Sequence, residues 1–306
     1  MSQPVQDDVV IGLSPPDGLT LSAFSLLVLI GGGNFVAVSI NVEELDPFWG
    51  AALRFGLAAI GLGAVVAVRR LSLPRQGALA RTLLYGTLNV GLGYAFAYWA
   101  LARVPAAIGS IVISSVPLAT FLFAIAHRQE RFRWRGLLGA VVAVAGIAVI
   151  SGGSSGNGLD LMSLLALVGA VACFAEGGVV AKGIAGTPPL VTNALGMATG
   201  ALILLVASRL AGEAVMLPTT TRTWVALTYL VLLGSIAFFA IFLFVLSRWT
   251  ASGVSYFTVL IPIVTVTLSA WLQADPITLP IVVGGALVLV GVWVGALATE
   301  RTAARR

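Results

Sequence analysis

The chain has 306 residues, of which 59% are hydrophobic and only 9% are charged. Soluble proteins carry about a quarter charged residues, so this composition excludes a water-soluble enzyme or a soluble nucleic-acid-binding domain and indicates a surface that faces lipid. The formal net charge of +5 is explained by the placement of the basic residues described below, and no nucleic-acid partner is expected.

Ten apolar segments follow one another along the chain, each bounded by charged residues, glycine or proline. Each has about the 20 residues that a helix needs to cross the hydrocarbon core of a bilayer. Lipid offers no partner for backbone N–H and C=O groups, and the runs lack the alternation of barrel strands, so we expect ten transmembrane helices. The expected spans are residues 20–41, 46–68, 81–102, 104–127, 133–151, 159–181, 188–209, 222–247, 251–273 and 277–298.

The first two spans carry the polar residues Asn34 and Arg54. An ionisable residue inside a membrane costs free energy and is therefore a functional candidate. Depth along the helices places Asn34 near Arg54, which predicts an amide-to-guanidinium contact and favours a structural or snorkelling role for the arginine. Glu176, the other ionisable residue within a span, lies too far from Arg54 in depth for a direct salt bridge. Asn34 is counted among the expected substrate-binding residues.

The third span carries a group of aromatic residues. Tyr94 and Tyr98 are four residues apart and share a helix face, and Trp99 lies one step round. Ring faces and phenols suit amphipathic organic solutes better than inorganic ions, so we predict that these residues bind substrate. Trp99 also lies near the outer membrane boundary, where membership of an aromatic belt is an equal alternative.

Pro117 and Pro262 lie well inside the fourth and ninth spans. Each removes a backbone donor and crowds the carbonyl four residues earlier, which predicts a kink in both spans. Kinks at these places would suit gating, and simple bending is an equal explanation. The single histidine, His127, ends the fourth span in an expected interfacial position, and the single cysteine, Cys173, is expected to be a packing residue. No metal site is predicted.

The carboxylate of Glu176 in the sixth span is the strongest ionisable candidate in the second part of the chain. It would hold a substrate amino group or carry a proton, and the alternative is a carboxyl hydrogen-bonded at the inner end of its helix. Phe174, close to Glu176, and Tyr256, in the ninth span, are further substrate-binding candidates, with ordinary packing as the alternative.

The sequence also repeats itself. A shift of 145 residues brings Pro117 onto Pro262 and Tyr94 onto Phe239, which predicts a facing ring and adds Phe239 to the substrate-binding residues. We therefore predict a single membrane domain, residues 1–306, with two five-helix halves at 20–151 and 159–298. Because five is odd, the second half enters the membrane from the opposite side, and such an inverted repeat is the basis of alternating access.

The basic residues fall mainly on one side of this topology. Thirteen of the Lys and Arg residues lie on the side of the two termini and three lie on the other, with Arg54 inside a span. Cytoplasmic loops are enriched in Lys and Arg, so we expect both termini in the cytoplasm. The acidic loop with Glu43, Glu44 and Asp46 then faces outward.

Short motifs recur in order along nearly the whole chain. They are Gly33-Asn34-Phe35-Val36, Pro47 with Arg54-Phe55, Glu130-Arg131 followed by Gly136 and Gly139, and Pro262, Gly284 and Gly291. These motifs and their order resemble the EamA-type members of the drug/metabolite transporter superfamily, and most closely the YddG-type amino-acid exporters. Two departures are Gly31, where the family often has tryptophan, and Asp275-Pro276, which replaces the usual glutamate of the second repeat. The resemblance implies a ten-helix, multi-pass exporter of the bacterial inner membrane.

The expected function is therefore secondary export of small metabolites, above all neutral or aromatic amino acids, by alternating access. A multidrug or nucleoside-type exporter is the alternative within this class. An intramembrane enzyme is the alternative from another class, and it is disfavoured because the spans lack a nucleophile with a base and a cluster of metal ligands. The expected partners are a small-molecule substrate and membrane lipid, no cofactor is expected, and a monomer is compatible with the sequence.

Overall fold

The computed structural model describes residues 17–127, 134–153, 160–184, 186–246, 248, 251–274 and 277–294, and within them the chain forms helices joined by turns and loops, with no strand. Six helical stretches are long and apolar enough to cross a membrane, and three shorter apolar helices accompany them. The predicted all-helical membrane class is thus confirmed. The Glu130-Arg131 and Asp275-Pro276 pairs lie outside the described residues.

The helices are α1 (Gly18–Val42), α2 (Pro47–Val68), α3 (Gln76–Tyr85), η1 (Gly86–Gly93), α4 (Tyr94–Leu101), α5 (Ala106–Ile113), α6 (Val116–Ala126), α7 (Trp134–Gly153), α8 (Leu161–Lys182), α9 (Pro189–Leu210), α10 (Thr221–Val231), η2 (Leu232–Ala237), α11 (Phe238–Leu246), α12 (Ala251–Leu272) and α13 (Leu279–Val292).

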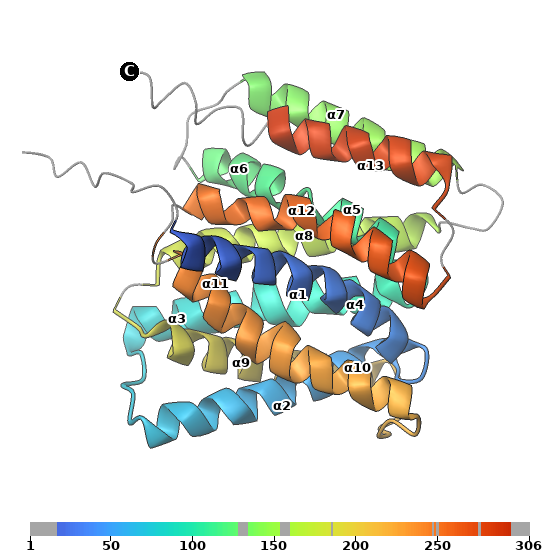
Figure 1. Cartoon of the computed structure of the whole chain (residues 1–306). Helices are drawn as coiled ribbons and strands as arrows, with labels where there is room; N and C mark the ends of the chain where they lie inside the picture. Colours follow the sequence, from blue (N-terminus) through green and yellow to red (C-terminus); the bar gives the residue numbers. More distant parts are fainter. Residues whose placement is uncertain are drawn as a thin grey trace, which may run out of the picture.

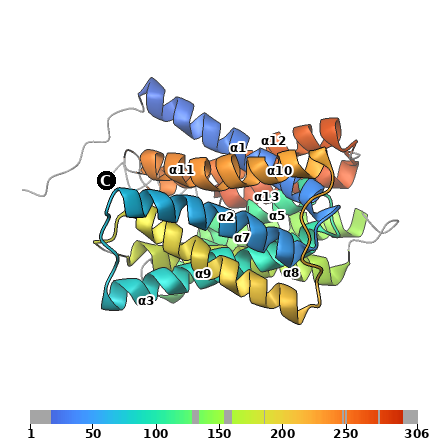
Figure 2. The same cartoon turned by 90° about the horizontal axis from the view of Figure 1, so that it is seen from below.

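The helices lie roughly alongside one another (Figure 1), with α7 and α13 packed together at one edge of the bundle and α2 near the opposite edge. Seen from below (Figure 2), α2 lies beside α9, against which it packs along its length. Large apolar side chains cover the outside, as at Ile60, Leu202 and Val225, which are 71%, 65% and 64% exposed. Such a surface is stable in lipid and unfavourable in water.

Two π-helical segments, η1 and η2, interrupt long helical stretches and were not predicted. A shift of 145 residues carries η1 onto residues 231–238, which contain η2, so the two segments occupy equivalent places in the repeat. Segment η1 packs against α8 and α9, whereas η2 packs against α1 and α2. Each repeat therefore places its π-helix on helices of the other repeat. Such segments are frequent at functional sites.

The two repeat-related prolines have different local structures. The fourth predicted span ends at Ile113 and restarts at Val116, so that Pro117 lies in the first turn of α6, where its missing N–H costs no helical hydrogen bond. Pro262 instead lies inside the continuous helix α12. The prediction of equivalent kinks is therefore wrong for Pro117, where the helix breaks and a new one begins.

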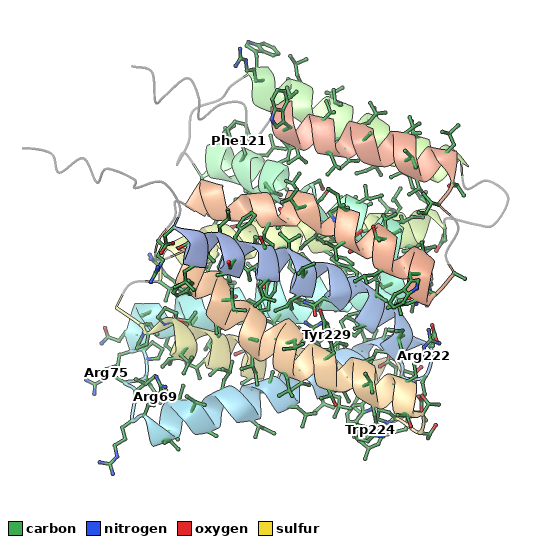
Figure 3. The ribbon with its side chains drawn as sticks, viewed as in Figure 1. Arg69, Arg75, Phe121, Arg222, Trp224 and Tyr229 are labelled. Atoms are coloured by element: carbon green, nitrogen blue, oxygen red, sulfur yellow. The ribbon has the colours of Figure 1, made fainter. Side chains whose placement is uncertain are left out.

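Glycines bring neighbouring helices into close contact. A Cβ atom built on Gly146 of α7 would lie 2.6 Å from the carbonyl oxygen of Gly284 on α13, and one on Gly291 would lie equally close to the backbone of α7. Near the middle of the bundle, Tyr229 covers Gly33 and donates a hydrogen bond of 2.9 Å to the carbonyl of Ile30 (Figure 3). Small residues thus allow packing of backbone against backbone.

We expect Gly146→Ala to lower the thermal unfolding midpoint of the purified protein in detergent. The added methyl group meets backbone atoms of α13, which cannot move away as a flexible side chain would, and overpacking of this kind costs about 1–3 kcal/mol. Gly63→Ala on α2 is the matched control, because nothing lies within 4 Å of its Cβ position. The control should leave the midpoint unchanged or raise it, and an equal midpoint for both variants would contradict the packing.

Candidate functional site

The centre of the candidate site is Arg54, whose side chain is fully buried. It extends from α2 to η2, where its Nε donates to Ser235 Oγ over 3.0 Å and its Nη2 donates to the carbonyl of Gly234 over 3.0 Å. Its Nη1 donates to the hydroxyl of Tyr98 on α4 over 3.3 Å. A single side chain from the first repeat therefore joins three helical segments across the boundary with the second repeat.

The Gly234 carbonyl also accepts a hydrogen bond of 3.4 Å from Nδ2 of Asn34. Asn34 and Arg54 thus meet on a shared acceptor, in place of the direct amide-to-guanidinium contact that was predicted. Glycine is required at position 234, because a Cβ atom there would press on Asn34 Oδ1 and on Arg54. The Asn34 Oδ1 atom is buried and has no hydrogen-bond partner among the described residues.

Aromatic rings pack around the guanidinium. The Tyr94 ring lies 4.5 Å from Phe55, 5.2 Å from Phe174 and 6.3 Å from Tyr98, measured between centroids. The Arg54 guanidinium carbon lies 4.8 Å from the Phe55 centroid and 5.3 Å from that of Tyr94, within the range of cation–π attraction. The structure therefore brings together Asn34, Tyr94, Tyr98 and Phe174 of the predicted substrate-binding residues.

The remaining predicted aromatic residues are Trp99, Phe239 and Tyr256. Trp99 lies near the end of α4, where the guanidinium of Arg103 is 3.8 Å from its ring centroid and donates to its carbonyl; this contact agrees with the aromatic-belt alternative. Phe239 packs against Phe238, with 5.6 Å between the ring centroids, and borders the same buried core as Tyr94. Tyr256 lies on α12, in a part of the helix where only the backbone is described.

Glu176 on α8 pairs with His127 at the end of α6, with 2.9 Å between Oε1 and Nε2. This contact is a hydrogen bond between the two side chains. It corresponds to the alternative of a carboxyl hydrogen-bonded toward the end of its helix, and it gives His127 a defined partner. The second carboxylate oxygen, Oε2, is buried without a hydrogen-bond partner among the described residues.

At the far end of the bundle, acidic side chains tie the loop between α1 and α2 to the loop between α9 and α10. Gly212 follows the end of α9 with a φ of 71°, and the chain turns there so that Glu213 faces the start of α2. The Glu213 carboxylate accepts from the backbone N–H groups of Phe48 and Trp49 over 3.1 and 2.7 Å. Because the start of a helix exposes unpaired N–H groups, this carboxylate caps α2 from the other repeat.

Glu44 makes a second connection between the same loops. Its carboxylate accepts hydrogen bonds from the backbone N–H and hydroxyl groups of Thr219 and Thr220. Hydrogen bonds from threonine side chains and backbone lower the Glu44 pKa from 4.5 to about 2. Glu43 adds an exposed ion pair with Arg222, at 2.8 Å. Asp46 accepts from the backbone N–H of Ala214 over 2.9 Å. We call the set of Glu43, Glu44 and Asp46 with their partners on 214–222, and Glu213 with its partners Phe48 and Trp49, the loop clamp.

Figure 3 places Arg222 and Trp224 at the clamped end of the bundle and Arg69 and Arg75 at the opposite end. The topology prediction assigns Arg222 to one side of the membrane and Arg69 and Arg75 to the other. The structure places them at opposite ends of the bundle. Among the described residues no group of three or more His, Cys, Asp or Glu side chains is arranged to hold a metal ion.

Long apolar helices around a buried polar centre are typical of a multi-pass membrane protein, and comparisons with known proteins give the family. The model of the EamA-like transporter family matches residues 19–152 and again residues 161–296. The chain therefore belongs to the EamA-like transporter family and is a multi-pass protein of the bacterial inner membrane.

Named relatives agree with this family. The chain is 26% identical over 259 residues to the uncharacterized inner membrane transporter YedA of Escherichia coli (strain K12), covering 84% of this chain and 83% of YedA. It is 25% identical over 282 residues to a probable amino-acid metabolite efflux pump of the same organism, covering 88% of this chain and 92% of the pump. A crystal structure shares its fold with a TM-score of 0.66 at 21% identity, covering 93% of this chain and 98% of the other.

Three residues of the site were not predicted as functional: Phe55, Gly234 and Ser235. A phenylalanine, a glycine and a serine in apolar spans are common packing residues, and their sequence positions do not reveal that η2 faces Arg54. The signal that could have found them is Arg54 itself. A buried guanidinium needs acceptors, and in membrane spans these are hydroxyl and free carbonyl groups.

We expect the thermal unfolding midpoint to fall as the pH is lowered from about 4.5 toward about 2. Because the folded-state pKa of Glu44 lies below its ordinary value, its carboxylate stabilises the folded state above about pH 4.5, and this contribution disappears as the pH approaches 2. Glu44→Gln should lower the midpoint at pH 7 and flatten the fall in that window. Glu43→Gln, which removes only the exposed pair with Arg222, is the control. A Glu44→Gln profile parallel to that of wild type would contradict the role of the clamp.

Proposed function

We propose that this transporter exports neutral or aromatic amino acids by alternating access between two inverted five-helix repeats. The observation that carries the proposal is the Arg54 network, which joins the two repeats in the bundle interior beside a cluster of aromatic rings. A site that both repeats build is altered whenever one repeat moves against the other. The relative named as a probable amino-acid metabolite efflux pump supports this substrate class.

The proposed topology has ten spans with both termini in the cytoplasm. Three of these spans are composite: α3, η1 and α4 form the third, α5 and α6 the fourth, and α10, η2 and α11 the eighth. The equivalent places of η1 and η2, each packed on helices of the other repeat, support the inverted arrangement. The loop clamp then lies on the outer face, and Arg69 and Arg75 lie on the cytoplasmic face.

In this proposal the aromatic side chain of the substrate packs against Tyr94 and Phe174, with Asn34 and Tyr98 beside them. Both rings are only partly buried, as a surface that must receive a solute requires. Glu176 and His127 form a polar pair on the route toward the end of α6. Phe239 borders the same buried core as Tyr94, Trp99 lies near the end of α4, and Tyr256 stays a candidate from the sequence. Pro117 and Pro262 allow the helices that carry them to move.

Counterflow in proteoliposomes tests this function. Vesicles loaded with unlabelled phenylalanine should take up labelled phenylalanine transiently, and protein-free vesicles should not. Tyr94→Ala should lower the flux about two- to tenfold, because a ring contact of this kind is worth about 0.5–1.5 kcal/mol. Phe96→Ala is the control on the same helix, since Phe96 is 40% exposed. Uptake of a drug or nucleoside in place of every amino acid would reject the substrate class, and no flux of any solute in a broad panel would reject the function.

Accessibility labelling tests the topology. Because Cys173 is the only cysteine, Cys173→Ala provides a background free of thiols. In that background Arg222→Cys should react with a membrane-impermeant maleimide in intact cells, and Arg75→Cys should react only after the inner membrane is permeabilised. The expected difference follows from the opposite ends that Arg222 and Arg75 occupy in the bundle. Equal labelling of the two variants in intact cells would contradict the proposed topology.

A further inference from the structure

Arg54 is a permanent cation without a counter-ion in the described part of the chain. Its three hydrogen bonds go to a carbonyl and two hydroxyl groups, which are neutral, and the ion pairs of the described residues involve other arginines and His127. A guanidinium cannot lose its proton in a protein, so its charge persists in the interior of the bundle. Burial of an unpaired charge is costly, and an anionic ligand would relieve that cost.

The guanidinium also has unused donors. It carries five N–H groups, of which the described chain engages three, and both terminal nitrogens, Nη1 and Nη2, retain one each. A carboxylate accepts hydrogen bonds from two such donors at once and binds them more strongly than a hydroxyl does. A carboxylate can therefore accept from the two unused N–H groups or displace the Tyr98 hydroxyl, whose hydrogen bond to Arg54 is the longest of the three at 3.3 Å.

An unused acceptor lies next to these donors. The Asn34 amide must direct Nδ2 toward the Gly234 carbonyl, because only the nitrogen can donate, and this leaves Oδ1 buried without a partner. Asn34 and Arg54 bind the same carbonyl oxygen, at 3.4 and 3.0 Å, so the unpaired acceptor and the unpaired donors lie within a few ångströms of each other. The hydroxyl of Tyr94 makes no hydrogen bond to a described residue, and the Tyr94 ring belongs to the aromatic cluster around Arg54.

We infer that Arg54 and Asn34 form a binding site for the zwitterionic end of an α-amino acid. The guanidinium takes the carboxylate, Asn34 Oδ1 accepts from the α-ammonium group, and the rings of Phe55, Tyr94 and Phe174 take the apolar side chain. This inference rests on the proposed amino-acid substrate class and defines its chemistry further: a carboxylate is required. Amines and amides that have the same side chain but lack the carboxylate bind weakly.

The same geometry connects binding to movement. Arg54 is held by Gly234 and Ser235 of the second repeat, so a carboxylate that engages the guanidinium competes with bonds between the repeats. Binding of the substrate thus weakens the connection between α2 and η2 at the moment when the repeats must rearrange. A neutral ligand has no comparable effect on these bonds.

The test compares L-phenylalanine with L-phenylalaninamide and 3-phenylpropionate as competitors of labelled phenylalanine counterflow, and as ligands that raise the thermal unfolding midpoint. For wild type we expect phenylalanine to bind about tenfold or more tightly than the amide, since loss of a charged hydrogen-bonding partner has an effect of this size. 3-Phenylpropionate, which keeps the carboxylate and lacks the ammonium group, should bind with intermediate affinity. Arg54→Gln should lower the affinity for phenylalanine more than that for the amide and so remove the preference for phenylalanine.

If Arg54 has only a structural role, Arg54→Gln should lower the affinities for phenylalanine and for the amide by the same factor. This result would overturn the inference. Arg54→Lys, which keeps the charge, should retain part of the preference. If Arg54→Gln fails to fold, the acid-to-amide ratio in wild type decides alone, and a ratio near one overturns the site. Transport of phenylalanine and the amide at equal rates would reject the site and retain the exporter. Carboxylate-selective binding without transport would support the site and reject the exporter.

Discussion

The structure depends on one constraint, the burial of a permanent cation at the boundary between two repeats. Arg54 is fully enclosed, and its acceptors come from η2 and α4 and not from its own helix. In lipid or in a packed interior, a guanidinium without acceptors would be strongly unfavourable, so α2 can occupy its position only while η2 supplies the Gly234 carbonyl and the Ser235 hydroxyl. These hydrogen bonds, together with packing, therefore fix the register of α2 against the second repeat.

The π-helical segment makes this arrangement possible. A regular helix uses each interior carbonyl for its own hydrogen-bond ladder, whereas a wider turn loosens that ladder and presents carbonyls to side chains. Gly234 lies in such a turn, and the absence of a side chain there leaves room for Asn34 and Arg54. The equivalent segment η1 packs on α8 and α9 in the same way, with Gly86 and Gly91 at close contacts. Helix α9, which it faces, carries no arginine at the position related to Arg54, which is Gly196 when the early spans are aligned by a shift of 142 residues.

The sequence was sufficient for the class of fold and for part of the site, because long apolar runs and an isolated arginine are strong signals. Tyr94 and Tyr98 were found from their helical spacing, and Asn34 from its polarity in an apolar span. The acceptors of Arg54 could not be found in this way, since contact between residues 54 and 235 depends on how distant helices pack. The helix break before Pro117 was also missed, because a proline within an apolar run has the same local pattern whether the helix bends or restarts.

The links between the repeats differ along the length of the bundle, and this difference bears on how the repeats move. The loop clamp holds the α1–α2 and α9–α10 loops chiefly through Glu44 and Glu213, each of which accepts two or more hydrogen bonds, with one each at Glu43 and Asp46. In the proposed binding site, Arg54 exchanges a neutral acceptor for a carboxylate while it stays in the interior. At the opposite end, three contacts join the repeats: Glu176 with His127, Arg81 with the Gly183 carbonyl, and Asp17 with Arg248. In the proposed alternating-access movement, each end can therefore open only when its own contacts between the repeats break.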